Sequence, residues 1–120
     1  MPTLNKEFSD FCAQRDAANT IQLNVVKWTW MLCDALRANA PDGYDYTFES
    51  GRKYHKIIMT DSGRGRSVHA FIDKKTGEVY KSATWKAPAK GVRYDLRLIK
   101  DREFLISNRK ADWAGSYLYM

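Results

Sequence analysis

Residues 54–84 read YHKIIMTDSGRGRSVHAFIDKKTGEVYKSAT, and this stretch decides the fold. It alternates short runs of β-branched and aromatic residues with the turn sequences DSGRG (61–65) and DKKTG (73–77), a pattern typical of antiparallel hairpins. In the second turn, Gly77 suits the left-handed position of a tight loop. We therefore expect a meander of about four antiparallel strands, over residues 44–48, 54–60, 67–73 and 78–84.

The residues before this stretch favour helix. Leu4, Phe8, Phe11 and Cys12 recur at helical spacing after Thr3, a residue that can cap a helix, so a short opening helix is expected. A longer helix follows and should end near residues 39–43, which read NAPDG. Two adjacent apolar stripes predict that it is largely buried. They comprise Ile21, Val25, Trp28, Leu32 and Leu36, and Leu23, Val26, Trp30 and Cys33.

After the expected sheet, residues 93–106 fit either a helix or a pair of strands. The helix is preferred, with Asp95 as its cap and Leu98, Ile99, Arg102 and Leu105 along its length. The last residues are aromatic, which predicts docking onto the core or onto a partner rather than a free end. The expected fold is an α+β single domain over residues 1–120, with N-terminal helices packed on the antiparallel meander and a C-terminal helix or strand pair.

Composition excludes several classes of protein. The 120 residues are 44% hydrophobic and 28% charged, as in an ordinary globular domain. The longest stretch without a charged side chain, residues 17–26, is shorter than the ~20 residues that a membrane helix needs. The N-terminus lacks the pattern of a signal peptide, so the protein is not expected to be secreted.

The cysteine and histidine content argues against a metal site. Cys12 and Cys33 both lie in helical patterns beside apolar residues, where a buried free thiol is the usual state. There is no CxxC motif, and the chain has two histidines. We expect a reducing cytoplasmic setting and neither a metal nor a cofactor.

Charge is unevenly distributed along the chain. Residues 1–51 carry four basic and seven acidic side chains, whereas residues 52–97 carry twelve basic and four acidic ones. The whole chain has a net charge of +6. A basic middle segment indicates an anionic partner, although lysine-rich solvated strands are equally common in small intracellular domains.

The candidate binding residues lie in this basic segment. Residues 81–94, KSATWKAPAKGVRY, interleave cations with aromatic rings, as binding of single-stranded nucleic acid requires. The turn at residues 61–67 adds two arginines that alternate with two glycines. The predicted nucleic-acid-binding residues are Arg64, Arg66, Lys81, Trp85, Lys86, Lys90 and Arg93. The alternative for the loop is that Trp85 is a buried anchor.

The two histidines flank the DSGRG turn. Pairing between residues whose numbers add to an even sum would place His55 and His69 on one sheet face with Phe71, as possible ligand contacts, and would turn Ile58 and Val68 towards the helix. Two imidazoles near basic groups could also act as general acid and base in phosphodiester cleavage. No carboxylate is spaced to orient either ring, so we expect no catalytic residue.

Residues 53–96, KYHKIIMTDSGRGRSVHAFIDKKTGEVYKSATWKAPAKGVRYDL, resemble a segment of small uncharacterised proteins of tailed bacteriophages. The specific part of this resemblance is residues 67–96. The resemblance implies a protein made in the cytoplasm of an infected bacterium, but it carries no activity that could be transferred to particular residues.

The preferred hypothesis is a non-enzymatic protein that binds nucleic acid or a nucleotide through its basic, aromatic sheet and loop. One alternative is an inhibitor that binds a host or defence protein through protein contacts, and another is a component of the virion. Self-association is a further expectation, and no membrane partner is expected.

Overall fold

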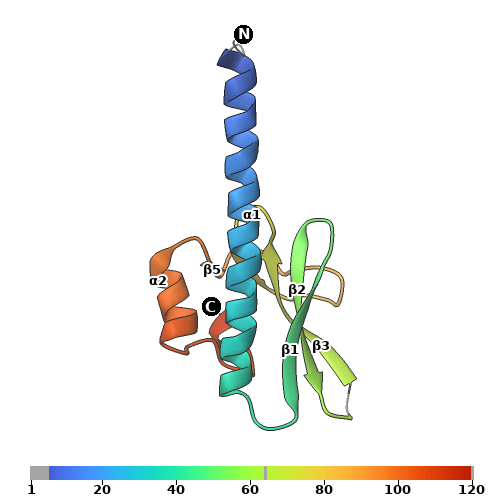
Figure 1. Cartoon of the computed structure of the whole chain (residues 1–120). Helices are drawn as coiled ribbons and strands as arrows, with labels where there is room; N and C mark the ends of the chain where they lie inside the picture. The colour runs from blue at the N-terminus through green and yellow to red at the C-terminus, as the bar shows by residue number, and fades with distance from the viewer. Residues whose placement is uncertain (1–5, 64, 120) are drawn as a thin grey trace.

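The computed structural model describes residues 6–63 and 65–119, with side chains described from residue 14 onward. A long helix, α1 (Lys6–Asn39), packs across one face of a five-stranded sheet, as Figure 1 shows. All strand pairs are antiparallel, and the spatial order follows the chain. The strands are β1 (Tyr44–Ser50), β2 (Tyr54–Asp61), β3 (Gly65–Asp73), β4 (Glu78–Lys81) and β5 (Tyr94–Asp95). The expected α+β meander is confirmed, with a short fifth strand added.

The N-terminal region forms one continuous helix where two were expected. No glycine or proline lies between Lys6 and Asn39, so nothing in the sequence breaks the helical backbone. The proposed cap Thr3 and the opening stripe from Leu4 to Cys12 lie outside the residues or side chains that the structure describes. The helix ends before Pro41, and Gly43 turns the chain into β1 with a φ of +94°.

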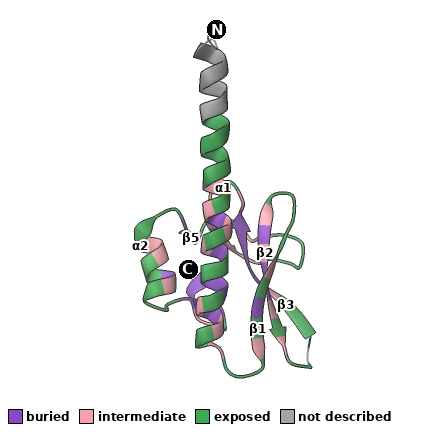
Figure 2. Ribbon diagram, viewed as in Figure 1, coloured by how far each residue is buried: buried purple, intermediate pink, exposed green. Residues whose placement is uncertain are grey.

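Helix α1 is buried along one side, so the expectation of a largely buried helix is wrong. Val25, Leu32 and Leu36 are fully buried, whereas Leu23 is 70% exposed and Trp30 is 45% exposed. The first apolar stripe therefore faces the core, and of the second stripe only Cys33 is fully buried. The reason is that the sheet covers one side of the helix. Residues 14–20 are exposed, and the helix extends past the sheet in Figure 2.

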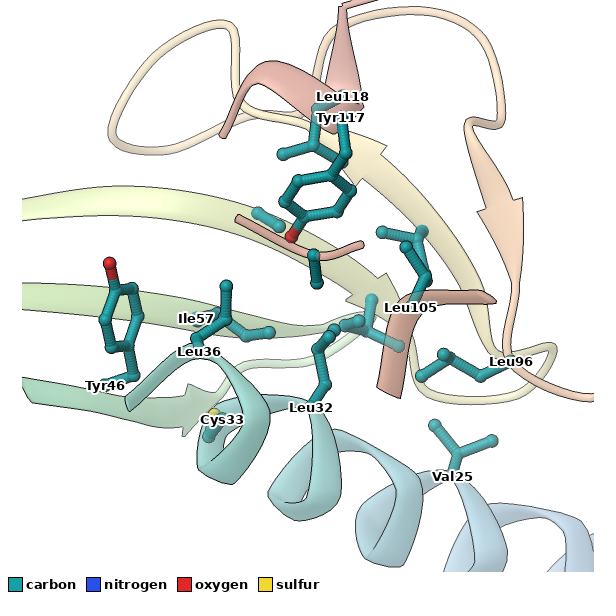
Figure 3. Packing of buried hydrophobic residues seen from close by; sticks show 14 residues of the cluster. Val25, Leu32, Cys33, Leu36, Tyr46, Ile57, Leu96, Leu105, Tyr117 and Leu118 are labelled. Atoms are coloured by element: carbon teal, nitrogen blue, oxygen red, sulfur yellow. The ribbon is translucent and has the colours of Figure 1, made fainter. Parts of the chain in front are cut away.

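The core combines three parts of the chain, as the close view in Figure 3 shows. Leu32 and Leu36 of α1 meet Ile57 of the sheet and Leu105 and Tyr117 of the C-terminal region. Burial of Tyr117 and Leu118 confirms that the aromatic end docks onto the core, although Tyr119 is exposed.

Hydrogen bonds fix the docked C-terminal segment. The Tyr46 hydroxyl donates to the carbonyl oxygen of Trp113 at 2.9 Å, and the Tyr94 hydroxyl donates to that of Tyr117 at 3.0 Å. Side chains from the two edge strands, β1 and β5, therefore bond to the backbone of residues 113–119, which we call the C-terminal segment. The regular structure of this segment is the short 3-10 helix η2 (Ser116–Leu118).

A β-bulge changes the register between β2 and β3. Ile57 pairs with Ala70, but Ile58 pairs with Val68, so His69 is an extra residue in β3. Directly paired residues share a face, and burial places Ile57 and Ala70 against the core that contains α1. We call this side the helix face and the opposite side the outer face.

This register corrects the predicted faces. The expected even-sum pairing holds from the turn to Ile58 and Val68, but beyond the bulge the paired numbers add to an odd sum, as in His55 with Ile72. His55 and His69 therefore lie on the helix side, and Phe71 lies on the outer face. Ile58 and Val68 also lie on the outer face, where the prediction had placed them against the helix.

Residues 93–106, expected to form a helix or a pair of strands, contain one short strand and a short helix. After the two-residue β5, the short helix α2 (Ile99–Arg102) continues into the π-helical turn η1 (Glu103–Ser107). Asp95 does not cap this helix, because Leu98 holds the cap position and Asp95 Oδ1 accepts a hydrogen bond from the Arg97 N–H at 2.9 Å.

No helix in the described part of the chain is both long and apolar enough to cross a membrane.

Two leucines of α1 provide a test of its one-sided burial. Leu32→Ala should lower the free energy of unfolding by about 2–5 kcal/mol, because it leaves a cavity against the sheet. Leu23→Ala, the matched control on the exposed side, should change it by less than about 0.5 kcal/mol. Urea unfolding followed by circular dichroism measures both, and equal losses would contradict the packing described here.

Candidate functional site

Aromatic side chains and cations gather on the outer face of the sheet. The Tyr54 ring lies 5.7 Å from that of Phe71 and 5.9 Å from that of Tyr80, both edge-on. Lys56 pairs with Phe71 across β2 and β3, and its ammonium lies 5.8 Å from the centre of that ring. Arg66 lies in the part of β3 between the bulge and the turn to β2. The bulge reverses which face the residues in this part occupy, so Arg66 lies on the outer face.

The loop after β4 brings Trp85 to this face. An isolated bridge between Ser82 and Pro88 closes the loop, and Thr84 Oγ1 accepts hydrogen bonds from the N–H groups of Lys86 and Ala87 at 3.2 and 3.1 Å. These bonds make the tip of the loop compact. Trp85 at this tip is 42% exposed. It is therefore neither a fully buried anchor nor a free side chain.

Two cations flank the Trp85 ring. The Lys56 ammonium lies 4.9 Å from the ring centre, and the Arg66 guanidinium carbon lies 5.6 Å from it. Such contacts contribute about 0.5–1 kcal/mol each at exposed sites. Arg66 also donates a hydrogen bond to Glu49 Oε1 at 2.5 Å, so one carboxylate already partners this cation.

A hollow of about 270 Å³ lies next to this cluster. Four cations and one carboxylate border it, and Tyr54 and Phe71 supply aromatic surface. We call it the outer-face hollow. Its lining residues are Glu49, Ser50, Gly51, Arg52, Lys53, Tyr54, Lys56, Phe71 and Lys86. An excess of cations beside rings is suited to a ligand that is both anionic and aromatic.

The structure divides the predicted binding residues into separate groups. Arg66, Trp85 and Lys86 gather at the outer face with Phe71, which is itself only 2% exposed. Lys81 instead borders another hollow, of about 310 Å³, beside the C-terminal segment, where its ammonium lies 4.4 Å from the centre of the Tyr119 ring.

Arg93 and Lys90 are not part of the outer-face cluster. The Arg93 guanidinium donates to the carbonyl oxygens of Leu118, Lys90 and Gly91 at 2.7, 3.1 and 2.8 Å. It therefore ties the loop to the C-terminal segment and has a structural role. Lys90 is exposed, and Arg64 lies outside the described residues.

Both histidines are buried, with His55 2% and His69 9% exposed. His69 Nε2 shares a hydrogen bond of 2.7 Å with the Tyr117 hydroxyl, and the His69 ring lies edge-on to Tyr46 at 5.5 Å. His55 Nδ1 shares one of 2.8 Å with the Ser50 hydroxyl. The expected exposed face with two imidazoles does not exist, because the bulge and the register turn both rings towards the helix side.

Burial also changes the acid–base properties of these side chains. It lowers the pKa of His69 to about 4, and it lowers the pKa of His55 with a smaller contribution from Lys74. Burial raises the pKa of the free Cys33 thiol to about 12, so this thiol stays protonated at neutral pH. Among the described residues, no group of three or more His, Cys, Asp or Glu side chains is arranged to hold a metal ion.

Several cations of the outer-face hollow were missed as individual candidates. Arg52 and Lys53 lie in the turn between β1 and β2, and Lys56 follows in β2. A meander places alternate turns at the same end of the sheet, so Lys74 and Lys75, after β3, lie near Arg52 and Lys53. Two pairs of adjacent basic residues in alternate turns, Arg52 with Lys53 and Lys74 with Lys75, were the sequence signal that these four cations lie together.

Comparison with known proteins places the chain in a family. The family of unknown function DUF7717 matches residues 8–120. The chain belongs to this family. No curated protein and no solved structure matches the chain. The DUF7717 match names no activity.

The burial of His69 predicts how stability depends on pH. The folded-state pKa of about 4 lies below the ordinary value of 6.5, so the unfolded chain binds more protons between these pH values. The contribution of His69 to stability is therefore complete above pH 6.5 and decreases as the pH falls towards 4, by up to about 3 kcal/mol.

Urea unfolding of the wild type and His69→Gln at several pH values isolates this contribution, because the other titrating groups are shared. The wild type should lose more stability than the variant between pH 6.5 and 4. An NMR titration in which the His69 imidazole of the folded protein titrates near 6.5 would contradict it.

Proposed function

We propose that this protein binds single-stranded nucleic acid or a nucleotide through the outer face of its sheet. The observation that carries the proposal is the half-exposed Trp85 ring flanked by Lys56 and Arg66, beside a hollow with four cations and one carboxylate. Single-stranded nucleic acids combine phosphates with exposed base surfaces, and they are bound by cations that track the backbone together with rings that stack on bases.

The Arg66–Glu49 pair suggests how a phosphate would enter. Both side chains are about half exposed, so their ion pair contributes little to stability. A phosphate oxygen can replace the Glu49 carboxylate as the acceptor for the Arg66 guanidinium, which leaves Arg66 close to Trp85. Binding through such exchangeable ion pairs should weaken steeply with salt.

The first test is the affinity for a fluorescent oligothymidine at several salt concentrations, measured by anisotropy. Replacing Lys56 and Lys86 with Gln should weaken binding for all base compositions and reduce the slope of log K against log salt by about 1.4, if each cation contacts one phosphate.

The control for this test carries the same loss of charge elsewhere. Lys100→Gln with Lys110→Gln changes two exposed lysines that lie outside the outer-face hollow, and this variant should bind nearly as the wild type does. Absence of binding of both oligothymidine and a free nucleotide by the wild type at low salt would refute the proposal, as would equal losses in the two double variants.

Trp85 tests the aromatic part of the proposal separately from charge. Trp85→Ala should weaken binding by about 1–3 kcal/mol, the usual effect of removing a stacking partner, whereas Trp85→Phe should keep much of the affinity. Circular dichroism checks that both variants fold. Unchanged affinity in Trp85→Ala would show that the site binds phosphates without stacking on this ring.

A protein partner is the second candidate function. Four large apolar side chains between residues 92 and 104 are more than one third exposed, namely Val92, Leu98, Ile99 and Phe104, and exposed apolar surface favours protein contacts. Under this alternative, the purified protein carries no nucleic acid and recovers one dominant protein after nuclease treatment of a lysate. Ile99→Asp should then abolish recovery, whereas Lys86→Gln should not.

A further inference from the structure

A second basic hollow lies at the end of the sheet where the turns of alternate hairpins meet α1. It has a volume of about 450 Å³, and three segments border it. Gln22 comes from α1, and Arg52 and Lys53 come from the turn before β2. Asp73, at the end of β3, and residues 74–76 of the following turn complete the lining. We call this hollow the turn pocket.

The backbone of the two turns is held together beneath the turn pocket. The Lys74 N–H donates to the Lys53 carbonyl oxygen at 3.0 Å, and Lys74 Nζ donates to the Gly51 carbonyl oxygen at 3.0 Å. Within the second turn, the Gly77 N–H donates to the Asp73 carbonyl oxygen at 2.9 Å, and Gly77 has the predicted left-handed conformation, with a φ of +77°. The hydrogen bonds of Lys74 to the other turn therefore fix the backbone of the two turns that carry the cations.

The charge of the turn pocket is strongly positive. Its lining contains one carboxylate, that of Asp73, and four cations, namely Arg52, Lys53, Lys74 and Lys75. Asp73 Oδ1 accepts hydrogen bonds from the N–H groups of Lys75 and Thr76 at 2.8 and 3.1 Å, so this carboxylate stabilises the backbone of the turn. Among the described residues, no carboxylate lies within ion-pair distance of any of the four cations.

The turn pocket and the outer-face hollow share a wall. Arg52 and Lys53 border both of them, so a ligand that crosses these two residues can occupy both hollows. The aromatic surface belongs to the outer-face hollow, through Tyr54 and Phe71, whereas the turn pocket offers ammonium, guanidinium and amide donors without a ring. This division corresponds to the two parts of a nucleic-acid strand, its bases and its phosphates.

We propose that the turn pocket is a phosphate-binding site and that it takes a phosphate of the same strand whose bases lie on the outer face. A tetrahedral phosphate has several acceptor oxygens, which match several donors arriving from different directions. This inference rests on the proposed function for its ligand, but the phosphate site itself is testable without any base.

The first experiment uses pyrophosphate as the probe and follows backbone amides by NMR. The signals of Lys74, Lys75 and Thr76 should shift with saturation, whereas those of Lys100 and Lys110 should stay in place. In Lys75→Glu the shifts should be lost, because the charge at the pocket is reversed. Shifts of equal size around Lys100 and Lys110 would overturn the phosphate site.

The second experiment compares the affinity of the wild type and of the Lys75→Glu variant for an oligothymidine decamer. Lys75 is exposed, its side chain borders only the turn pocket, and Lys110→Glu is a control with the same change of net charge. Lys75→Glu should weaken binding of a decamer about tenfold, as expected for loss of a charged hydrogen bond, and Lys110→Glu should have a much smaller effect.

The outcomes separate this inference from the proposed function. If Lys56→Gln with Lys86→Gln weakens decamer binding but Lys75→Glu acts only as Lys110→Glu does, the turn pocket is not on the path of the strand, and the inference is overturned while the proposed function stands. If neither the decamer nor a free nucleotide binds but pyrophosphate shifts the turn amides, the proposed function fails and the phosphate site is supported.

Discussion

The extra residue in β3 sets the organisation of both faces of the sheet. His69 has no partner in β2, and this reverses the alternation of β3. Arg66 and Val68, between His69 and the turn, therefore lie on the face opposite to the one that unbroken pairing would give them. One result is that the His69 ring lies in the core, against Tyr46 and Tyr117. The other is that Arg66 joins Lys56 and Phe71 on the outer face. A single backbone irregularity thus supplies a core contact and a surface cation.

The C-terminal segment completes the core that α1 and the sheet begin. It contains little regular structure, so hydrogen bonds from Tyr46, Tyr94 and Arg93 to its carbonyl oxygens replace a ladder or a helix. Arg93 shows why a charged residue in a basic segment cannot be assigned to a ligand from its type alone. Its guanidinium already donates to three carbonyl oxygens, and one of these bonds, to Leu118, holds the segment that covers His69.

The basic residues between 52 and 97 form several groups rather than one. Hairpin topology collects Arg52, Lys53, Lys74 and Lys75 at one end of the sheet, and strand pairing places Lys56 and Arg66 on the outer face. The loop after β4 adds Lys86 and Trp85 to the second group. The proposed function and the phosphate site both depend on this gathering, because isolated exposed lysines attract anions weakly.

Local patterns in the sequence determined the elements of this protein. Spacing of apolar residues located the part of α1 that carries the buried stripe, and the glycine-containing turns located four strands and the left-handed Gly77, because these features depend on near neighbours. The sequence left open whether the candidate binding residues converge, and the structure brings Trp85, Lys86 and Arg66 to the outer face while Lys81 and Arg93 lie elsewhere. Only the tertiary structure decided which face each strand residue occupies, since one unpaired residue reverses the alternation and no local pattern marks it. Burial of both histidines and the position of Arg66 on the outer face follow from that choice, and the exposed side of α1 follows from which side of the helix the sheet covers.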